Sequence, residues 1–188
     1  MHTAAEPARK RFTTDEFEKM AEAGVFSPDA RLELIDGEII EMTPVGGRHV
    51  TCVFALDDYF REVVGPEVRV ATQNVLKLAD ANPWPDVALL RRDRVVPGQL
   101  PGADACLLVV EVADSTVLHD RNKKRLLYAR AGVPEYWVVD LQQDTVVVHL
   151  RPSAGDYDAI EEHARGESFV SVALGRAVAV DPLLPVDG

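Results

Sequence analysis

The sequence predicts an α+β fold in which a mixed β-sheet is flanked by helices. The segment 105–112 is an almost continuous apolar run, which is typical of a central strand buried on both faces. The segment about 48–64 has the apolar face of a helix, and the segment about 117–131 lies between helix-starting and helix-ending residues. With 188 residues, the chain suits one domain that can bury a sizeable core.

The N-terminal part is expected to combine an arm with a short helix. Residues 1–12 have the composition of a flexible arm, and residues 13–188 are expected to form a single domain with no internal linker. Thr13 or Thr14 can cap a helix that ends at Gly24.

A β-hairpin is expected next, because the strong turn signal Asp36-Gly37 separates two segments of alternating polarity, 31–36 and 38–43. The expected apolar face of the following helix comprises Val50, Val53, Phe54, Leu56, Phe60, Val63 and Val64. Besides the central strand, extended structure is expected over 67–79 as a pair, 86–90, 135–140, 145–150, and near 157–162 and 168–172.

Composition narrows the classes of function. Lys and Arg total 20 against 31 Asp and Glu, so the net charge is -11, which argues against a protein that coats nucleic acid or a membrane surface. It leaves room for a small basic site on an acidic body. Cys52 and Cys106 lie among apolar neighbours and are expected to be buried thiols. With no zinc-type spacing, signal core or membrane-length apolar run, we expect a cytoplasmic protein.

Two carboxylates and a lysine stand apart from the packing pattern. Asp86 opens a strand after Pro85, and Glu111 lies at the end of the most apolar strand, where an unpaired carboxylate is costly to bury. On the next helix, Asp120, Lys124 and Tyr128 form one row at a spacing of four residues.

This combination predicts metal-assisted hydrolysis of a phosphodiester. Two carboxylates on neighbouring strand ends, Asp86 and Glu111, suit Mg²⁺ (or Mn²⁺), which keeps several waters. A lysine beside them can orient or help deprotonate the attacking water and stabilise charge on the phosphate. Simpler interpretations remain open at this point. Asp86 can cap a turn, Glu111 can pair with an arginine, and Asp120 and Lys124 can form a solvated ion pair.

The same residues resemble a known family. Glu33–Glu38 with Met42, Pro85-Asp86-Val-Ala, Val110-Glu111-Val with Ser115-Thr116, the Asp120, Lys124 and Tyr128 row, and the string Gly132-Val-Pro-Glu-Tyr-Trp-Val-Val-Asp140 are similar to the Uma-two family. These are endonucleases with the PD-(D/E)XK restriction-endonuclease-like fold. The resemblance implies a DNA endonuclease that uses Mg²⁺ or Mn²⁺. The alternative is a catalytically inactive module of this fold that binds nucleic acid or protein.

The resemblance also implies roles for individual residues. Asp86 and Glu111 match the two metal-binding acids of the family pattern. The usual lysine two residues after the second acid is replaced here by Ala113, and Lys124 matches the relocated lysine. Additional candidates for a supporting role are Glu33, with Glu38 as its competitor, Gln73, Asp120 and Tyr128.

Other residues are expected to serve structure or assembly. His49 begins a helix after two glycines and is expected to be an exposed capping residue, with binding or proton transfer as the alternative. Tyr136 and Trp137 are expected to pack or to form an interface on an exposed strand. With the family analogy, they suggest a homodimer, since two sites related by a two-fold axis can cut both strands.

Basic residues gather in two windows that follow the Asp86 and Glu111 strands. They are Arg91, Arg92 and Arg94, then Arg121, Lys123, Lys124, Arg125 and Arg130. We expect both windows to lie near the same end of the sheet and to form a local basic rim that contacts phosphates. Binding to DNA should then be modest and steeply dependent on salt.

Overall fold

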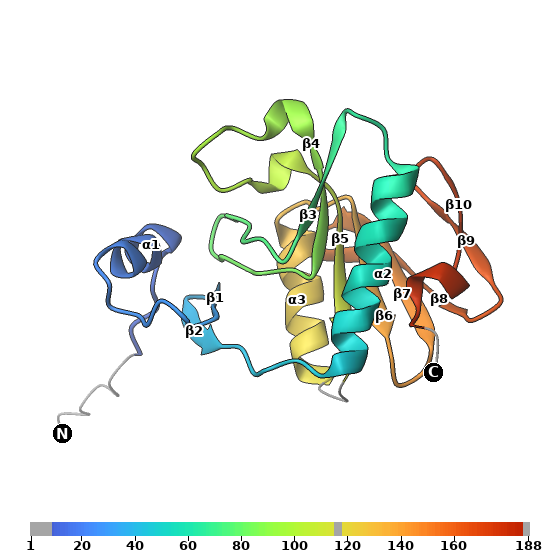
Figure 1. Cartoon of the computed structure of the whole chain (residues 1–188). Coiled ribbons are helices and arrows are strands. Elements are labelled where there is room, and N and C mark those ends of the chain that lie inside the picture. The colour runs from blue at the N-terminus through green and yellow to red at the C-terminus, as the bar shows by residue number, and fades with distance from the viewer. Residues whose placement is uncertain (1–8, 115–117, 186–188) are drawn as a thin grey trace, which may run out of the picture.

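The chain begins with a short helix beside the main body of the molecule (Figure 1). The computed structural model describes residues 9–114 and 118–185. Helix α1 (Thr14–Glu22) begins where the Thr13 hydroxyl accepts a hydrogen bond from the Glu16 backbone and the Glu16 carboxylate accepts one from the Thr13 backbone. This reciprocal arrangement is a capping box, so the predicted start of the helix is confirmed.

A two-stranded hairpin follows α1. Strands β1 (Leu32–Ile35) and β2 (Glu38–Glu41) pair antiparallel across Asp36 and Gly37, which both adopt positive φ. Such a turn favours Asp-Gly, because glycine carries no Cβ that would oppose positive φ. The backbone N–H of Phe12 donates to the carbonyl of Gly37 at 2.9 Å, so the end of the predicted arm contacts this turn.

Within the described residues, six strands form the main sheet in the order β3-β4-β5-β6-β7-β8. Their bounds are β3 (Val68–Thr72), β4 (Val87–Arg91), β5 (Cys106–Ala113), β6 (Glu135–Asp140), β7 (Thr145–Ser153) and β8 (Asp156–Ala164). Strands β5 and β6 are parallel and the other neighbours antiparallel. The predicted mixed sheet is confirmed, and the continuous apolar run forms the central strand β5.

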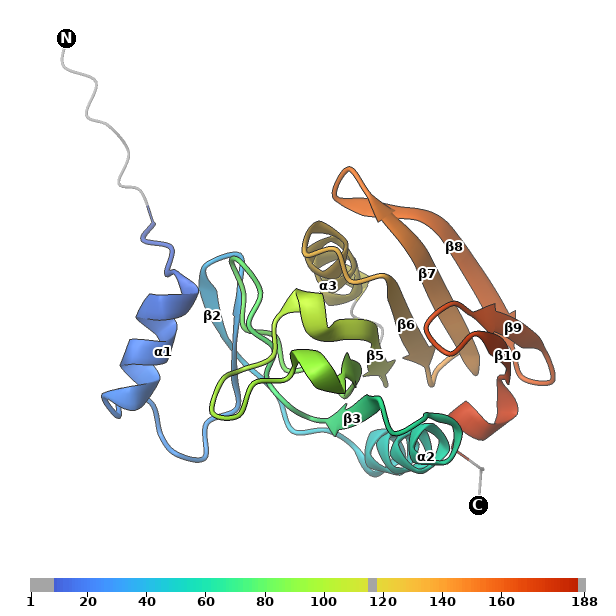
Figure 2. The ribbon, with the colours of Figure 1, turned by 90° about the horizontal axis from the view of Figure 1, so that it is seen from above.

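Two helices cover opposite faces of this sheet, as Figure 2 shows from above. Helix α2 (Gly47–Val63) packs Cys52, Leu56 and Phe60 against one face, and helix α3 (Leu118–Arg130) packs Leu127 and Tyr128 against the other. The C-terminal elements pack on the α2 side. They are the hairpin of β9 (Ser168–Ser171) and β10 (Arg176–Ala179) and the 3₁₀ turn η3 (Asp181–Leu183), while the turns η1 (Arg92–Arg94) and η2 (Ala103–Ala105) lie between β4 and β5.

Two local predictions are wrong. The second half of the predicted extended pair, about 75–78, forms no regular strand. It makes a single isolated β-bridge, between Lys77 and Gly102. Phe54 was expected on the buried face of its helix, yet 65% of it is exposed. The buried face of α2 runs through His49, Val53, Leu56 and Phe60, and Phe54 lies one residue, about 100°, away from that stripe.

For the aromatic pair Tyr136 and Trp137, the packing interpretation is confirmed and the interpretation as an exposed interface is wrong. Tyr136 and Trp137 are 1% and 0% exposed, because β6 is an interior strand whose two faces are covered by the two helical layers. They form core packing and cannot supply a dimer interface, so the homodimer stays a prediction without this support. In the part of the chain that the structure describes, no helix has both the length and the apolarity needed to cross a membrane.

Candidate active site

A cleft of about 450 Å³ lies between the β1–β2 hairpin, the start of α2 and the main sheet. Asp86, Glu111 and Lys124 line it together with Glu33 and His49. The strand register explains why the first two meet. Strands β4 and β5 pair antiparallel with Val87 opposite Val110, and one further step along this register places Asp86 beside Glu111.

The carboxylate of Asp86 is buried and held from two sides. Its Oδ2 accepts a hydrogen bond from the backbone N–H of Val112 at 2.8 Å and lies 3.1 Å from Nε2 of His49. Burial alone would lower the pKa of His49, but the hydrogen bond and charge of Asp86 outweigh burial, and the pKa is raised. The other ring nitrogen, Nδ1, is buried and has no hydrogen-bond partner among the described residues.

The second half of the site is a lysine shared by two glutamates. The Nζ of Lys124 lies 3.0 Å from Oε1 of Glu33 and 3.1 Å from Oε1 of Glu111. The same oxygen of Glu111 accepts from the Tyr128 hydroxyl at 2.7 Å, and that of Glu33 accepts from the Trp84 backbone N–H at 2.7 Å. The lysine side chain is only 14% exposed, so these carboxylates are its principal surroundings.

The charged groups of this cluster shift one another's pKa values. Burial raises the pKa of Glu111, Lys124 lowers it, and Asp86 and Glu33 raise it again, with a net value of about 7. Burial by itself lowers the pKa of Lys124, but the attraction of Glu111 and Glu33 is stronger, so the pKa is raised and the ammonium stays charged. Burial and the neighbouring carboxylates raise the pKa of Tyr128 well above its usual value, so its hydroxyl remains a donor.

A pH-dependent affinity for metal follows from the carboxyl of Glu111. A metal ion needs the carboxylate form, which is the minority form below a pKa of about 7. Binding of Mn²⁺ should therefore be about tenfold tighter near pH 8 than near pH 6, and it should release a proton at the lower pH. Titration calorimetry in buffers of different ionisation enthalpy measures both effects.

The control for this prediction is Glu111→Gln, which cannot titrate and should bind Mn²⁺ weakly with no rise across this range. Without metal, the pH dependence of folding stability runs the other way. The pKa of Glu111 is about 7 in the folded protein and 4.5 as its usual value, so Glu111 destabilises the fold progressively as pH rises from about 4.5 to about 7. Wild-type protein whose Mn²⁺ affinity did not change with pH would contradict the assignment of Glu111.

The hairpin that carries Glu33 is fixed against the body. Leu34 and Asn82 exchange backbone hydrogen bonds of 3.4 and 2.9 Å, which tie β1 to the segment before β4. At the turn, the guanidinium of Arg130 on α3 lies 2.6 Å from the carboxylate of Asp36. The hairpin thus forms a wall of the cleft that is anchored at both ends.

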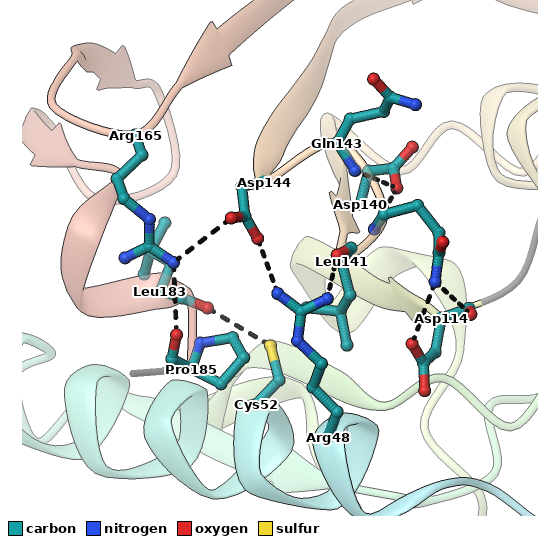
Figure 3. Close-up of polar contacts among 11 residues, drawn as sticks. Arg48, Cys52, Asp114, Asp140, Leu141, Gln143, Asp144, Arg165, Leu183 and Pro185 are labelled. Atoms are coloured by element: carbon teal, nitrogen blue, oxygen red, sulfur yellow. Dashed lines mark hydrogen bonds and ion pairs between the residues drawn. The ribbon is translucent and has the colours of Figure 1, made fainter. Parts of the chain in front are cut away.

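The start of α2, which carries His49, is anchored by the cluster drawn in Figure 3. The side chain of Arg48 points away from α2 toward the β6–β7 turn, where it donates to the carbonyl of Leu141 and, at 2.9 Å, to the carboxylate of Asp144. On the other side of Asp144, Arg165 lies 3.9 Å from its carboxylate and donates to the carbonyl of Pro185 at 3.2 Å. The position of His49 is therefore coupled to the C-terminal segment.

Of the residues predicted to support the site, some lie in the acidic cluster and others do not. Glu33 lies in the cluster, whereas its competitor Glu38 is exposed and pairs with Arg11 at 3.6 Å. Gln73 meets the Asp86 segment through its backbone, with a hydrogen bond from its N–H to the carbonyl of Asp86 at 2.9 Å. Tyr128 contacts Glu111 as described above. The side chains of Asp120 and Arg121 lie outside the described residues.

The predicted basic rim is wrong in its first half. Because β4 runs antiparallel to β5, the last residue of β4, Arg91, and the next residue, Arg92, lie at the opposite end of the sheet from Glu111. A five-residue strand separates them from Asp86, which is roughly 17 Å. In the second window, Lys123 lines the cleft, while Arg125 lies 3.4 Å from the carboxylate of Asp156 on β8.

The preferred prediction for His49, an exposed capping residue, is wrong, and only the alternative placed it in the site. The ring is 6% exposed and bonds to Asp86. A signal for this exists in the sequence, because His49 stands four, seven and eleven residues before the core residues Val53, Leu56 and Phe60. A polar residue on the buried face of a helix needs a polar partner, and the partner lies 37 residues further on.

The donor set can be compared with what a divalent ion requires. No group of three or more His, Cys, Asp or Glu side chains that could hold a metal ion exists among the residues with described positions. Asp86 and Glu111 nevertheless fit Mg²⁺ or Mn²⁺, which takes one or two carboxylates and keeps several waters. Besides burial, the charges of Asp86 and Glu33 contribute to the raised pKa of Glu111, so these carboxylates lie close enough to repel one another and a cation between them would relieve that repulsion.

Comparisons with known proteins agree with this architecture. The Uma2 family model, described as "Putative restriction endonuclease", matches residues 14–181. The chain is also similar to a protein of Anabaena variabilis ATCC 29413 whose crystal structure is described as that of "a putative nuclease belonging to DUF820". The two are 18% identical over 92% of this chain and 97% of that one, with a TM-score of 0.73. The search of curated proteins finds no match. The predicted fold is confirmed by this likeness.

Proposed function

The chain belongs to the Uma2 family, and on this basis we propose that it is a metal-dependent endonuclease that hydrolyses phosphodiester bonds of DNA. The observation that carries the proposal is the position of the Lys124 ammonium, held at 3.0 and 3.1 Å by Glu33 and Glu111 in a cleft that Asp86 also lines. A charged lysine among buried carboxylates suits the transition state of phosphoryl transfer, in which negative charge develops on the phosphate oxygens.

Asp86 and Glu111 are the residues that would hold Mg²⁺ or Mn²⁺. When bound, such an ion supplies Lewis acidity and lowers the pKa of a coordinated water. The remaining chemistry belongs to the chain. His49 and the backbone N–H of Val112 orient the Asp86 carboxylate. Tyr128 orients Glu111 in the same way.

We assign Lys124 the role of electrostatic stabiliser. Its raised pKa keeps the ammonium protonated, so it donates hydrogen bonds to an anionic phosphate or an attacking water and is a poor base. Glu33 accepts from the Trp84 backbone and from Lys124, and so fixes the lysine at the edge of the metal-binding pair. Glu33 is therefore a positioning residue.

Replacing Lys124 with methionine separates metal binding from catalysis. The variant should cleave about 100-fold more slowly, because one preorganised donor is removed from the transition state. It should still bind Mn²⁺ at alkaline pH, where Glu111 is ionised, but loss of the ammonium raises the pKa of Glu111 and moves this binding to higher pH. Circular DNA, offered both as single strand and as supercoiled duplex, reports cleavage, and calorimetry reports Mn²⁺ affinity.

The matched control is Lys19→Met, which alters an exposed lysine on α1 and should leave both measurements unchanged. Cleavage by Lys124→Met at the wild-type rate would contradict the proposed role. If the wild-type protein neither binds Mn²⁺ nor cleaves either DNA, the chain is instead an inactive module of this fold.

A further inference from the structure

The walls of the cleft differ sharply in chemistry. The acidic cluster with Asp86 and Glu111 forms one part of the lining. Another part, the apolar wall, is contributed by the β1–β2 hairpin and the segment leading into α2, namely Ile35, Ile40, Met42, Pro44 and Val45. A phosphate backbone has no favourable contact with such a wall, whereas the faces of unpaired bases do.

The size of the cleft points in the same direction. Its volume of about 450 Å³ lies in the range of pockets that enclose a single small-molecule-sized ligand, about 300–1,000 Å³. One or two nucleotides are ligands of this size. A duplex presents two charged strands about 6 to 12 Å apart across its grooves, and its bases face each other and are hidden from an apolar wall.

The distribution of charge disfavours a duplex as well. Among the described residues that line the cleft, the basic side chains are Arg31, His49, Lys123 and Lys124, of which His49 and Lys124 are already paired within the acidic cluster. The acids are Glu33, Glu41, Asp86, Glu111 and Asp114. A long duplex footprint needs a row of basic residues along the phosphates, and Arg91 and Arg92 lie at the other end of the sheet.

Arg31 is a planar cation at the cleft that can stack on an unpaired nucleic-acid base. The guanidinium of Arg31, which lines the cleft, lies over the ring of Trp84 at 5.1 Å from its centroid. This cation–π contact favours a guanidinium position beside the ring, and guanidinium planes are stacking partners for unpaired bases. Trp84 also donates its backbone N–H to Glu33, so this platform is joined directly to the acidic cluster.

From these observations we propose that the cleft accepts an unpaired DNA strand, with its bases against the apolar wall and its phosphate at the Asp86, Glu111 and Lys124 cluster. The proposal rests on the proposed function and names its substrate class. In this proposal, the apolar wall of the hairpin determines the specificity for unpaired bases. The protein contacts only a few phosphates, and not the longer row that the expected basic rim would contact.

Fluorescence anisotropy tests the proposal without any requirement for cleavage. The probe is a labelled single strand of about 15 nucleotides, compared with the duplex of the same sequence, in the absence of metal. The single strand should bind at least about tenfold more tightly than the duplex. Its affinity should decrease only gently with salt, with a slope on logarithmic axes of about -1.4 to -2.1, as expected for two or three phosphates.

Val45→Asn places a neutral polar group on the wall and should weaken single-strand binding about fivefold. The matched control is Val170→Asn, at an exposed valine on β9. Duplex binding equal to or tighter than single-strand binding, or Val45→Asn binding like wild type, would overturn the proposal. Tight single-strand binding with no metal-dependent cleavage would support this inference and count against the proposed function, so the two failures are distinguishable.

Discussion

Replacing Asp86 with asparagine is expected to reduce metal-dependent cleavage by about 10³-fold or more. The substitution removes one of two carboxylates at the proposed metal site and leaves Glu111 and Lys124 in place. Asparagine has nearly the same shape, and its carbonyl oxygen can still accept the 2.8 Å hydrogen bond from the Val112 backbone. The fold should therefore persist, and the loss should appear both as slower cleavage of circular DNA and as weaker Mn²⁺ binding.

Glu41→Gln is the matched control for the charge change. Glu41 also lines the cleft and is exposed, but it is outside the hydrogen-bonded cluster of described residues. Its loss should change cleavage by less than about threefold, because an exposed charge is well screened. An Asp86→Asn protein that cleaves within tenfold of wild type, after purification free of contaminating nucleases, would show that the site lies elsewhere.

The largest effect on stability is expected from Trp137→Ala, at about 4–5 kcal/mol. The ring is fully buried and packs edge-on against Phe169 at 4.9 Å and beside Phe60 at 5.7 Å. Its Nε1 also donates to the buried carboxylate of Glu135 at 2.7 Å. The substitution thus creates a cavity between β6 and α2 and removes one donor from a carboxylate whose pKa burial already raises.

Urea denaturation followed by circular dichroism measures this loss. Trp137→Phe retains most of the ring volume and loses the N–H, so it should fall between wild type and alanine. Phe54→Ala, at a ring that is 65% exposed, should cost less than about 1 kcal/mol. A cost below about 1.5 kcal/mol for Trp137→Ala would contradict the full burial of Trp137 on the interior strand β6.

The elements of this fold could be predicted from sequence because their signals are local. The Asp36-Gly37 turn, the apolar run of β5 and the capping residue Thr13 each act on their immediate neighbours. Asp86, Glu111 and Lys124 could be chosen as site candidates from sequence because the two carboxylates lie at the ends of apolar strands and Lys124 matches the family pattern. Their assignment as the catalytic residues stays a prediction.

The predictions that failed depend on where strands lie and in which direction they run. Asp86 precedes β4 and Arg91 ends it, so the two lie at opposite ends of this strand, and the antiparallel pairing with β5 leaves only Asp86 near Glu111. Tyr136 and Trp137 are buried because β6 has neighbours on both edges and a helix on each face, which the strand's own residues do not reveal. His49 lies in the site because the start of α2 lies beside Asp86 at the start of β4, and the sequence of α2 alone does not show this contact.

A crystal structure of the protein soaked with Mn²⁺ tests the central claim most directly, because the anomalous signal locates the ion without reference to activity. The account predicts a peak between the carboxylates of Asp86 and Glu111 in the wild-type protein and no peak there in Asp86→Asn. Absence of that peak at saturating Mn²⁺, or a peak at another group of residues, would contradict it.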